Sequence, residues 1–477
     1  MSDSFFSAPG SASHQVDLAI LGAGPGGYVA AVRAAQLGLT VAVIEGRWWG
    51  GVCLNVGCVP TKALVQNAEV ADLVTRRATT FGISGDVSVD YTAGWRRSRD
   101  VASTMSKGVR HLMKKNGVQA IDGWGTFTGP HSLSVAQADG QTSEWTFGNA
   151  IIATGAAPKT LPGIGIGGPV MTYEQLIMAE ELPKSLVIAG SGAIGVEFAS
   201  IAASFGTKVT LVEYLDRLVP NEDEAVSKEL ARAFRQRGIE ARVATAVRGV
   251  NTAGGRVTVE VEPVAGGEAA LLQADALLLA LGFEARTRGF GLETTGVALD
   301  ARGFIATDGL MRTNVPRIFA IGDVTGKLML AHVAQRQGVI AAEAIAGQQP
   351  LPIDYDSMPR ATYCDPPIAS VGLTEAQAKA AGYDVKVSRF PFAANGKARG
   401  MGEPGGFAML VADAAHGELL GAHLVGPGVT ELLPELVLAK TWDLTAGEIA
   451  VTVHAHPTLS EVVKGAAEGI VGSPIDL

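Results

Sequence analysis

The sequence predicts an α/β protein in which two domains of the strand–helix–strand type precede a smaller C-terminal α+β domain. Two observations carry this prediction. A glycine motif between an apolar strand and a helix occurs twice, in residues 16–45 and again in residues 186–213. From residue 351 the pattern changes to a proline-rich segment, alternating strands and two helical segments. The length of 477 residues is compatible with about three domains.

The composition restricts the class of protein. A net charge of −9 argues against a nucleic-acid binder. Three cysteines cannot form the disulfide framework of a small secreted protein. No apolar run reaches the roughly 18 residues of a membrane-spanning helix, and the first fifteen residues lack the basic and apolar regions of a signal peptide. We therefore expect a disordered leader over residues 1–15 and a soluble, cytoplasmic protein.

The first glycine motif lies in the context that dinucleotide binding requires. A short apolar strand precedes Gly22, Gly24 and Gly27, an alanine-rich helix follows them, and a second strand ends at Glu45. The glycines allow a tight turn and the close approach of a pyrophosphate. The helix N-terminus faces the phosphates, and the acidic residue binds ribose hydroxyls. Together these features predict a Rossmann-like dinucleotide-binding domain, and the alternative is a glycine-rich turn without a ligand.

The second copy repeats the same order of features. Its glycines are Gly190, Gly192 and Gly195, and its acidic residue is Glu213. In both copies the acidic residue follows the last glycine by 18 positions. The chain is therefore predicted to bind two dinucleotides. Because Glu213 would repel a 2′-phosphate, the second site should prefer NAD to NADP.

Two of the three cysteines lie in residues 50–62 (GGVCLNVGCVPTK). Positions five apart in an ideal helix have Cα atoms roughly 8–9 Å apart, whereas a disulfide needs about 4.4–6.8 Å. If Cys53 and Cys58 are bridged, the backbone between them cannot be regular helix, and Gly57 supplies the necessary freedom. A helix is predicted with Pro60 near its start, and a thiol at a helix N-terminus is reactive. The alternative is two buried structural thiols.

A third strand pattern also ends in an acidic residue. Residues 317–324 (RIFAIGDV) read as a buried strand that ends at Asp323. A carboxylate at a strand end beside a glycine suits the polyol of a flavin. The alternative is a structural aspartate in a turn.

The segment HAHPTLSE (residues 454–461) places two histidines and Glu461 in one short loop. A histidine oriented by a carboxylate is a general base whose pKa lies near neutral pH. The alternative is a satisfied surface or core histidine. A metal site is disfavoured because no third ligand is evident.

Taken in order, the cysteine stretch, the two glycine motifs, FAIGDV and HAHPTLSE resemble the flavin-dependent disulfide reductases, class I of the pyridine nucleotide-disulfide oxidoreductases. Within them the chain is similar to the bacterial dihydrolipoamide dehydrogenases, the E3 components of 2-oxo-acid dehydrogenase complexes. The resemblance runs from about residue 16 to the C-terminus. It implies that protein-bound dihydrolipoamide is oxidised to lipoamide through a redox-active disulfide and tightly bound FAD, with hydride passed to NAD⁺. It also implies a homodimer, and a lipoyl-bearing E2 component as partner.

The resemblance assigns roles to individual residues. Cys53 is the outer thiol that exchanges with substrate, and Cys58 is the inner thiol against the flavin. Lys62 lies near the flavin N5 and pairs with Glu197. The implied FAD-binding residues are Gly22, Gly24, Gly27, Glu45, Gly51, Lys62, Gly125, Thr154, Gly155, Asp323, Leu330, Ala331 and His332. The implied NAD-binding residues are Gly190, Gly192, Gly195, Glu213 and Gly282.

The resemblance also implies an acid/base and a division into domains. His456, oriented by Glu461, works on the cysteine pair of the other subunit. Residues 1–155 form the first part of the FAD-binding domain and residues 156–282 the NAD-binding domain. Residues 283–350 form the second, central part of the FAD-binding domain, and residues 351–477 form the dimerisation domain.

The sequence departs from the family pattern at two places and is compatible in part with two rival functions. Many relatives have Ser at Thr61, and a common Gly-Arg-x-Pro-Asn pattern is replaced here by residues 282–286 (GFEAR). The nearest rival is an NADPH-dependent glutathione-type or mercuric reductase, which Glu213 and the absence of a C-terminal cysteine pair oppose. A non-catalytic flavoprotein would have lost the cysteine pair or His456, and both are intact.

Overall fold

The computed structural model describes residues 13–477. The chain divides into two compact units. The first comprises Met1–Pro60, Arg96–Lys159 and Phe283–Ile353, and the second comprises Thr61–Trp95, Thr160–Gly282 and Asp354–Leu477. Most of the predicted leader lies outside the described residues. Its last three residues were wrongly assigned, because strand β1 begins at Ser13 and pairs with β6 along its whole length.

The first unit is built on a seven-stranded sheet in the order β3-β2-β1-β6-β5-β4, with β17 paired to β6. Strands β1, β2, β3, β6 and β17 are parallel, and β4, β5 and β6 form an antiparallel meander. The bounds are β1 Ser13–Leu21, β2 Val41–Glu45, β3 Gln119–Asp122, β4 Trp124–Gly129, β5 Ser132–Ala136, β6 Thr142–Ile152 and β17 Ile318–Ala320.

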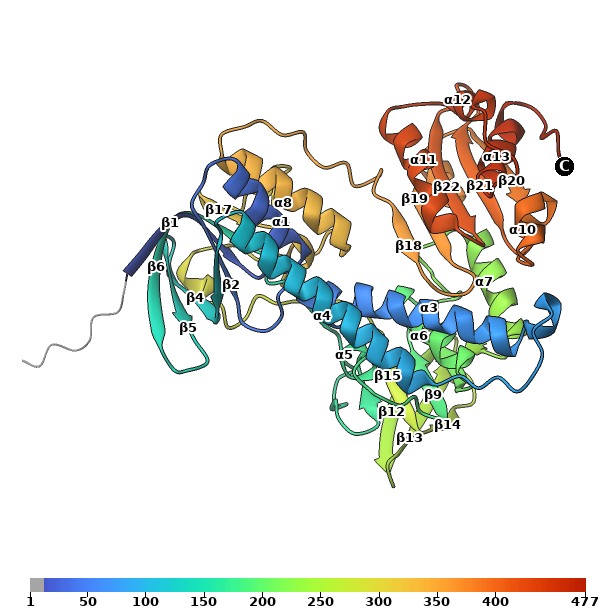
Figure 1. Ribbon diagram of the computed structural model, residues 1–477, viewed down its shortest axis with the longest axis horizontal. Coiled ribbons are helices and arrows are strands. Elements are labelled where there is room, and N and C mark those ends of the chain that lie inside the picture. The colour runs from blue at the N-terminus through green and yellow to red at the C-terminus, as the bar shows by residue number, and fades with distance from the viewer. Residues whose placement is uncertain (1–12) are drawn as a thin grey trace, which may run out of the picture. The chain divides into compact units, whose positions relative to one another are not determined.

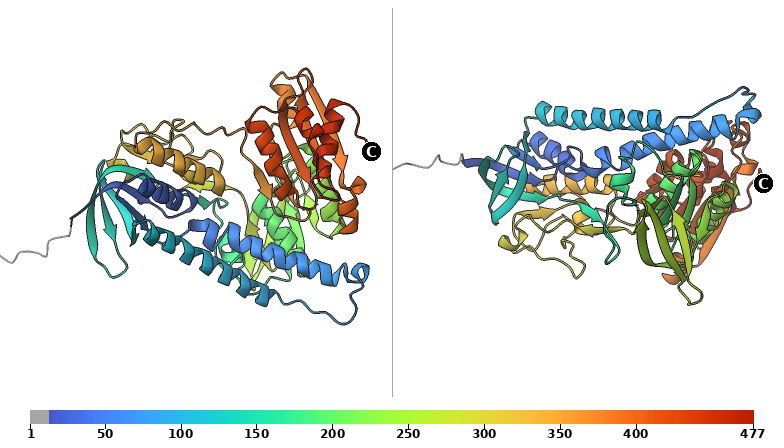
Figure 2. Two further views of the ribbon diagram at one scale, coloured as in Figure 1. Left: turned by 45° about the horizontal axis from the view of Figure 1, so that its top comes forward. Right: turned by 90° about the horizontal axis from the view of Figure 1, so that it is seen from below.

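Helices α1 (Pro25–Gln36) and α8 (Ala331–Ile345) lie side by side on one face of this sheet (Figures 1 and 2). Alternate residues of β1 face opposite sides, as the pleat requires. Leu18 and Ile20 pack in the core with both helices, whereas Ala19 and Leu21 pack in a second core against the meander. Gly338 permits the close approach of the helices, because a Cβ there would lie 2.6 Å from the carbonyl oxygen of Gly26.

The remaining elements of this unit are short or span its boundary. Strands β7 (Ala156–Pro158) and β16 (Phe283–Ala285) form an antiparallel pair. Helix α2 (Gly51–Asn55) precedes α3 (Cys58–Thr75), and α4 (Tyr91–Lys115) has most of its length here. Short 3₁₀ helices cover Leu292–Thr294 and Gly322–Thr325 in this unit, and Ala78–Phe81 and Phe392–Ala394 in the second unit.

The second unit contains a parallel five-stranded sheet in the order β11-β10-β9-β15-β8 and an antiparallel sheet β12-β13-β14. Apolar residues of both sheets share one core. The strands are β8 Val170–Met171, β9 Ser185–Ala189, β10 Lys208–Val212, β11 Glu240–Arg242, β12 Thr245–Ala253, β13 Arg256–Pro263, β14 Ala270–Ala274 and β15 Ala276–Leu279. The helices are α5 Tyr173–Leu176, α6 Ala193–Ser204 and α7 Glu224–Gln236.

The same unit contains a C-terminal antiparallel sheet in the order β18-β19-β22-β21-β20 (Figure 1). One face of this sheet is covered by α11 (Val429–Thr441) and α13 (Glu461–Val471), which share its apolar core. The strands are β18 Arg360–Thr362, β19 Ile368–Gly372, β20 Val385–Pro391, β21 Phe407–Asp413 and β22 Leu419–Val425. Shorter helices are α9 Glu375–Ala380, α10 Gly396–Gly400 and α12 Ala446–Val451.

The predicted fold class is confirmed, with two parallel nucleotide-type sheets and a C-terminal α+β domain. No helix within residues 13–477 combines the length and the apolar character that crossing a membrane requires.

Candidate active site

Cys53 and Cys58 form a disulfide whose Cα atoms are 4.6 Å apart. Helix α2 ends at Asn55 and α3 begins at Cys58, so two non-helical residues separate the helices that carry the cysteines. The expectation that a bridged pair requires an irregular backbone is therefore confirmed. Gly57 fits this break, because a Cβ there would lie 3.0 Å from the carbonyl oxygen of Val52.

The disulfide helix α2 starts directly against the first glycine motif. The backbone N–H of Gly50 donates to the carbonyl of Ala23 at 2.9 Å. Gly51 has φ +65°, and a Cβ there would lie 2.6 Å from the Cα of Gly24. Only glycine fits such an approach. The reducible bond and the predicted phosphate-binding turn are thus neighbours within one unit.

Polar contacts fix the loop that carries α2. The Trp49 carbonyl accepts hydrogen bonds from Asn55 Nδ2 at 2.9 Å and from Ser106 Oγ at 2.8 Å. The indole N–H of Trp49 donates to Asp122 Oδ1 at 2.8 Å. Arg99 Nη1 donates to the Asn55 carbonyl at 2.8 Å. Helix α4, which provides Arg99 and Ser106, therefore supports the disulfide.

The first glycine motif has the shape of a dinucleotide cradle. A Cβ on Gly22 would lie 2.3 Å from the Ala153 carbonyl oxygen, and one on Gly27 would lie 1.9 Å from the Gly22 carbonyl oxygen. Packing within the protein therefore requires these two glycines. A Cβ on Gly24 would meet only the Cα of Gly51, at 3.9 Å, so the space beside Gly24 is open to a ligand.

In the second motif, too, packing requires two of the glycines and leaves open space beside the middle one. Cβ atoms on Gly190 and Gly195 would lie 2.3 Å and 2.0 Å from carbonyl oxygens of Ala280 and Gly190. A Cβ on Gly192 would meet nothing within 4 Å. The residues thus fit a pyrophosphate that approaches the middle glycine of each motif.

The two acidic residues at the strand ends also hold the glycine turns in place. Glu45 Oε2 accepts from the backbone N–H of Ala23 at 2.8 Å, and Glu213 Oε2 accepts from that of Ser191 at 2.7 Å. The other oxygen accepts from a backbone N–H two residues later, that of Arg47 or Leu215. Each carboxylate accepts three hydrogen bonds in all and so retains one of its roughly four acceptor sites for a ribose hydroxyl.

The strand predicted to end at Asp323 is shorter than expected, because β17 ends at Ala320 and Gly322, with φ +72°, ends the extended backbone. Asp323 lies in the 3₁₀ helix Gly322–Thr325 that follows. Within the described residues its carboxylate accepts no hydrogen bond, and burial raises its pKa to about 6. A buried carboxylate without donors fits a ligand that provides hydroxyl donors, as the polyol of a flavin does.

The other predicted cofactor residues occupy varied positions. Thr154 Oγ1 donates to the Arg286 carbonyl at 2.7 Å, which places residues of the GFEAR departure beside the end of β6. Gly125 lies in β4, where a Cβ would lie 3.2 Å from Ile44 Cγ2. Gly155 and Gly282 have φ +75° and φ +91° and open space beside them. Leu330, Ala331 and His332 form the start of α8.

Lys62, one turn after Cys58 on α3, pairs with Glu197 of α6. Lys62 Nζ lies 3.0 Å and 2.9 Å from the two oxygens of the buried Glu197 carboxylate. An ammonium bound to both oxygens has a defined position even though the Lys62 side chain is 34% exposed. The predicted pair is thus present in the geometry.

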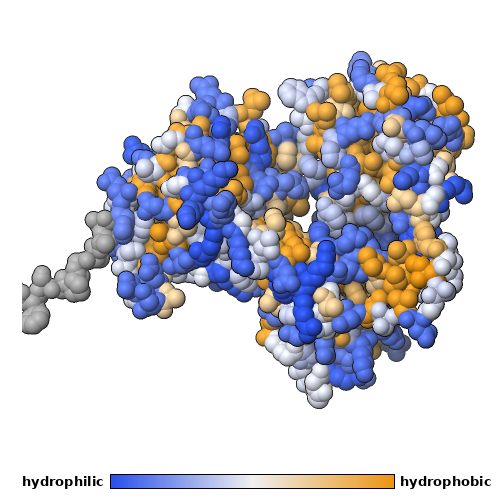
Figure 3. All heavy atoms as spheres, viewed as in Figure 1, coloured by the Kyte–Doolittle hydropathy of each residue, from blue (hydrophilic) through white to orange (hydrophobic). Residues whose placement is uncertain are grey.

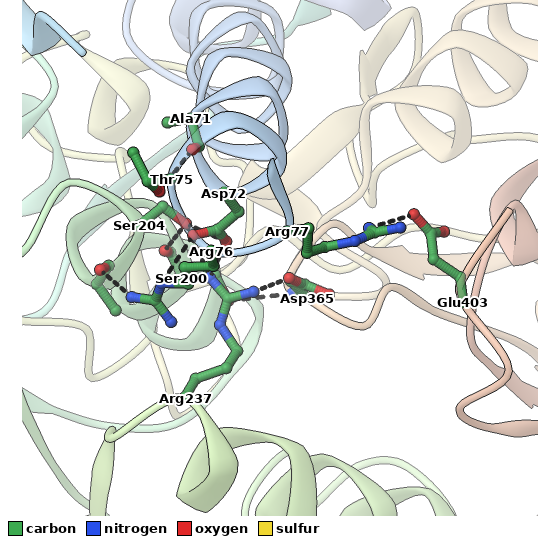
Figure 4. A network of polar contacts seen from close by, with 11 residues as sticks. Ala71, Asp72, Thr75, Arg76, Arg77, Ser200, Ser204, Arg237, Asp365 and Glu403 are labelled. Atoms are coloured by element: carbon green, nitrogen blue, oxygen red, sulfur yellow. Dashed lines mark hydrogen bonds and ion pairs between the residues drawn. The ribbon is translucent and has the colours of Figure 1, made fainter. Parts of the chain in front are cut away.

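A buried polar network links the rest of α3 to α6 (Figure 4). Asp72 Oδ2 accepts from Ser204 Oγ at 2.8 Å and from Arg237 Nη2 at 2.6 Å. Arg76 Nη2 donates to the Ala203 carbonyl at 2.7 Å. Burial lowers the pKa of the Arg237 guanidinium, and Asp72 opposes this effect. The helix that begins at Cys58 is therefore attached at several points to the helix that follows the second glycine motif.

His456 and Glu461 meet as predicted, with His456 Nδ1 2.9 Å from Glu461 Oε1. Glu461 is the first residue of α13 rather than part of the loop. Burial raises the pKa of Glu461, but the Thr458 N–H and His456 outweigh it and hold the pKa below its usual value. The side chain of His456 is 78% exposed, so its outward face is accessible.

His454 has a different environment from His456. Its side chain is 5% exposed, and its Nε2 lies 3.0 Å from Glu435 Oε1 on α11. His454 is therefore a satisfied structural histidine, and Cys364, the third cysteine, is a buried free thiol.

Comparisons with known proteins agree with this geometry. A family model described as pyridine nucleotide-disulphide oxidoreductase matches residues 16–338, and a model described as the dimerisation domain of that family matches residues 358–467. The chain belongs to the pyridine nucleotide-disulphide oxidoreductase family. The family is thus represented over most of the chain, which includes both glycine motifs and the cysteine stretch.

Individual members of the family are similar over nearly the whole length. The dihydrolipoyl dehydrogenase of Mycobacterium tuberculosis is 53% identical over 461 residues, which cover 96% of this chain and 99% of the relative. That of Bacillus subtilis is 41% identical over 471 residues, covering 97% and 99%. Among solved structures, LpdA of Mycobacterium tuberculosis has a TM-score of 0.88 at 29% identity, covering 95% of this chain and 99% of that one. The HOCl-induced flavoprotein disulfide reductase RclA of Escherichia coli has a TM-score of 0.86 at 29% identity, covering 95% and 99%.

Several residues that shape this oxidoreductase site are not evident in the sequence. Ser191 binds Glu213 through both its backbone N–H and its hydroxyl, at 2.7 Å and 2.8 Å. Tyr363 places its ring over Lys62. Ser191 lies between Gly190 and Gly192 in the motif whose acidic residue is Glu213, so the motif itself could have indicated this contact. No sequence pattern connects Tyr363 with Lys62, since the two lie far apart in the chain.

Proposed function

We propose that the protein is a dihydrolipoyl dehydrogenase that oxidises protein-bound dihydrolipoamide through Cys53 and Cys58 and passes hydride to NAD⁺. The observation that carries this proposal is the Cys53–Cys58 disulfide on a helix that starts against the first glycine turn, with Gly50 bonded to Ala23. A reducible bond next to a dinucleotide site suits electron transfer between a dithiol and a bound cofactor. The similarity to dihydrolipoyl dehydrogenases at 41–53% identity supports the choice of substrate.

The cofactors of the proposed enzyme are FAD and NAD. The first glycine motif, Glu45 and the donor-free carboxylate of Asp323 would hold FAD, and the second motif with Glu213 would hold NAD. FAD, when bound, supplies a two-electron acceptor between a thiol pair and NAD⁺. The open space beside Gly24 and Gly192, which the protein's own atoms leave free, supports both assignments.

The residues of the chain perform the thiol chemistry. His456 takes the proton from one substrate thiol, and Glu461 orients the imidazole and stabilises its charged form. The resulting thiolate attacks the Cys53 sulfur, and the S–S bond breaks so that Cys58 leaves as a thiolate. The second substrate thiol loses its proton to solvent and then attacks the substrate sulfur of the mixed disulfide. Lipoamide leaves as a cyclic disulfide, and Cys53 becomes a thiol with the proton from His456.

The proposed enzyme is a homodimer in which His456 works on the cysteine pair of the partner subunit. Side chains of large apolar residues near the histidine loop are exposed, including Trp442 at 69% and Val453 at 93%. Figure 3 shows hydrophobic side chains at the surface of the C-terminal domain near α12. A second copy would cover such a surface, and the match to the dimerisation domain supports this arrangement.

The proposal includes a second partner, a lipoyl-bearing E2 component of a 2-oxo-acid dehydrogenase complex. The chain carries a net charge of −9, so the docking partner should present a basic face.

The rival with NADPH and glutathione disulfide is disfavoured by the second site. Glu213 is buried at the position where a 2′-phosphate would lie. The nearby Arg217 is engaged with Asp216 and the Pro220 carbonyl rather than presented as part of a basic cluster.

The test is a side-by-side assay of the purified, FAD-loaded protein. One arm measures NAD⁺ reduction with dihydrolipoamide, and the other measures NADPH oxidation with glutathione disulfide. Turnover in the first arm alone is expected. Turnover in the second arm alone would replace the proposal with a glutathione-type reductase, and no turnover in either arm with FAD bound would leave a binding module.

A further inference from the structure

Lys62 is held from two sides by residues of its own unit. Its Nζ atom binds both oxygens of Glu197, and it lies 4.5 Å from the centroid of the Tyr363 ring. A cation within about 6 Å of an aromatic face is attracted by the negative charge density of the ring. One carboxylate and one ring therefore define the place of the ammonium.

The same carboxylate positions the ring. The backbone N–H of Tyr363 donates to Glu197 Oε1 at 2.9 Å. Two residues later, the backbone N–H of Asp365 donates to Ser200 Oγ at 3.1 Å, and the Asp365 carboxylate pairs with Arg237 (Figure 4). Glu197 and Ser200 are neighbours on one face of α6. The segment that carries the ring is thus fixed along α6 by contacts that do not involve the ring.

The ring, and not the hydroxyl, is the part of Tyr363 that contacts Lys62. Within the described part of the chain, the hydroxyl makes no hydrogen bond. A lysine side chain has many rotamers, and a partner on one side leaves it free to swing away. A second surface on another side removes part of that freedom. Tyr363 provides this surface at a place that Glu197 has already fixed.

We propose that Tyr363 is a positioning residue that holds the Lys62 ammonium through the face of its ring. This rests on the proposed function, in which Lys62 lies beside the flavin. Glu197 then acts on Lys62 twice, directly through its carboxylate and indirectly by fixing the backbone under the ring. The ring makes the charge near the flavin fixed in place rather than mobile.

The experiment uses the full-length, FAD-loaded enzyme with Tyr363→Phe, Tyr363→Leu and Tyr363→Met. The measurements are kcat and KM for dihydrolipoamide with NAD⁺, and the midpoint potential of the bound flavin. Tyr363→Phe keeps the ring and should retain most of the activity. Tyr363→Leu and Tyr363→Met should lower kcat about three- to tenfold, the range that loss of one cation–π contact gives. They should leave KM nearly unchanged and move the potential in the direction in which Lys62→Met moves it.

Two controls separate positioning from a general structural effect. In a Lys62→Met background, Tyr363→Leu should have no further effect on kcat or on the flavin potential, because the contact is already lost. Tyr383→Leu removes a tyrosine that is 42% exposed elsewhere in the same unit, and it should change neither quantity.

Three results would overturn the proposal. The first is a loss of kcat in Tyr363→Phe as large as that in Tyr363→Leu. The second is an equal loss of kcat when Tyr363→Leu is made in the Lys62→Met background. The third is an unchanged flavin potential in Tyr363→Leu and Tyr363→Met. If Tyr363→Leu fails to bind FAD, Tyr363→Met, which also lacks the ring, provides the same test. If the wild-type protein does not turn over dihydrolipoamide, the proposed function fails, but the flavin potentials of the variants still test the role of Tyr363.

Discussion

At the scale of single residues, three carboxylates that follow strands are placed in two different ways. Glu45 and Glu213 each accept backbone N–H groups from the glycine turn that they face. Asp323 accepts none from the described residues, and burial raises its pKa to about 6. Glu45 and Glu213 therefore have a structural role in addition to the binding role proposed for them, whereas Asp323 has only the proposed one.

Glu213→Ala should weaken NAD binding about tenfold or more and relax the discrimination against NADP. The substitution removes a charged acceptor, whose hydrogen bonds contribute about 1.5–3 kcal/mol, and removes the repulsion of a 2′-phosphate. Kinetic constants for both nucleotides measure this. Glu268→Ala, which changes an exposed acidic residue in the loop between β13 and β14 of the same unit, is the matched control. An unchanged preference for NAD over NADP in Glu213→Ala would show that another residue binds the ribose and sets the preference.

FAD binding by the apoprotein should strengthen as pH rises through about 6. The unliganded carboxyl of Asp323 favours its protonated form below that pH. Hydroxyl donors favour the ionised form, so FAD must displace a proton in acid. Quenching of FAD fluorescence should give an affinity about tenfold weaker at pH 5 than at pH 7. Asp323→Asn should abolish this dependence, and a variant that retains the full slope would exclude Asp323 as its source.

At the scale of elements, helix α3 connects the disulfide with the helix of the second glycine motif. Its first residue is Cys58, and its later turns provide Lys62, Asp72 and Arg76 to α6. The two carboxylates in these contacts, Glu197 and Asp72, are buried, so each depends on its hydrogen-bond partners. These contacts attach α3 to α6 beyond the turn that carries the disulfide.

Asp72→Ala should destabilise the second unit by about 1.5–3 kcal/mol, because Arg237 loses its charged hydrogen bond to Asp72 and keeps only the pair with Asp365. The side chains of Asp72 and Arg237 are only 11% and 13% exposed. The midpoint of thermal unfolding measures the loss. Lys228→Ala breaks a pair whose partners are 74% and 66% exposed and should not change that midpoint. Equal midpoints for Asp72→Ala and the wild type would mean that the network does not stabilise the fold.

At the scale of the whole molecule, the family match to a dimerisation domain and the exposed apolar residues of that domain lead to the same assembly. The role proposed for His456 on a partner subunit requires an exposed side chain, and in the single chain this side chain is 78% exposed.

Trp442→Glu should weaken dimerisation and lower dihydrolipoamide turnover in parallel, because it places a charge in an apolar interface. Sedimentation velocity measures the association, and FAD content should be retained. The control is Leu271→Glu, which changes a residue that is 68% exposed on β14 of the antiparallel sheet β12-β13-β14, outside the C-terminal sheet. A Trp442→Glu protein that sediments as the wild type does would place the interface elsewhere.

Local patterns predicted much of this site, whereas contacts between distant segments were not predictable. The two glycine motifs were recognisable because strand, turn, helix and acidic residue follow one another within 30 residues. The environment of His454 was not recognisable, because its partner Glu435 lies on α11, which α12 separates from the histidine in the chain. The start of β1 was missed because His14 and Gln15 are exposed and show no apolar alternation. Tyr363 reaches Lys62 only through the folded arrangement of α3, α6 and β18.

The most direct test of the central claim is to identify which thiols dihydrolipoamide exposes. The native, FAD-loaded enzyme is treated without air and without NAD⁺ with a small excess of dihydrolipoamide, then alkylated and analysed by peptide mass spectrometry. New alkylation should appear at Cys53, with Cys58 protected until denaturation and then modified in equal amount. Cys364 is the internal reference, because burial raises the pKa of its thiol and it should react only after denaturation, with or without substrate. If dihydrolipoamide exposes neither Cys53 nor Cys58 to alkylation, although the same preparation reduces NAD⁺ with dihydrolipoamide in a parallel assay, the account is contradicted.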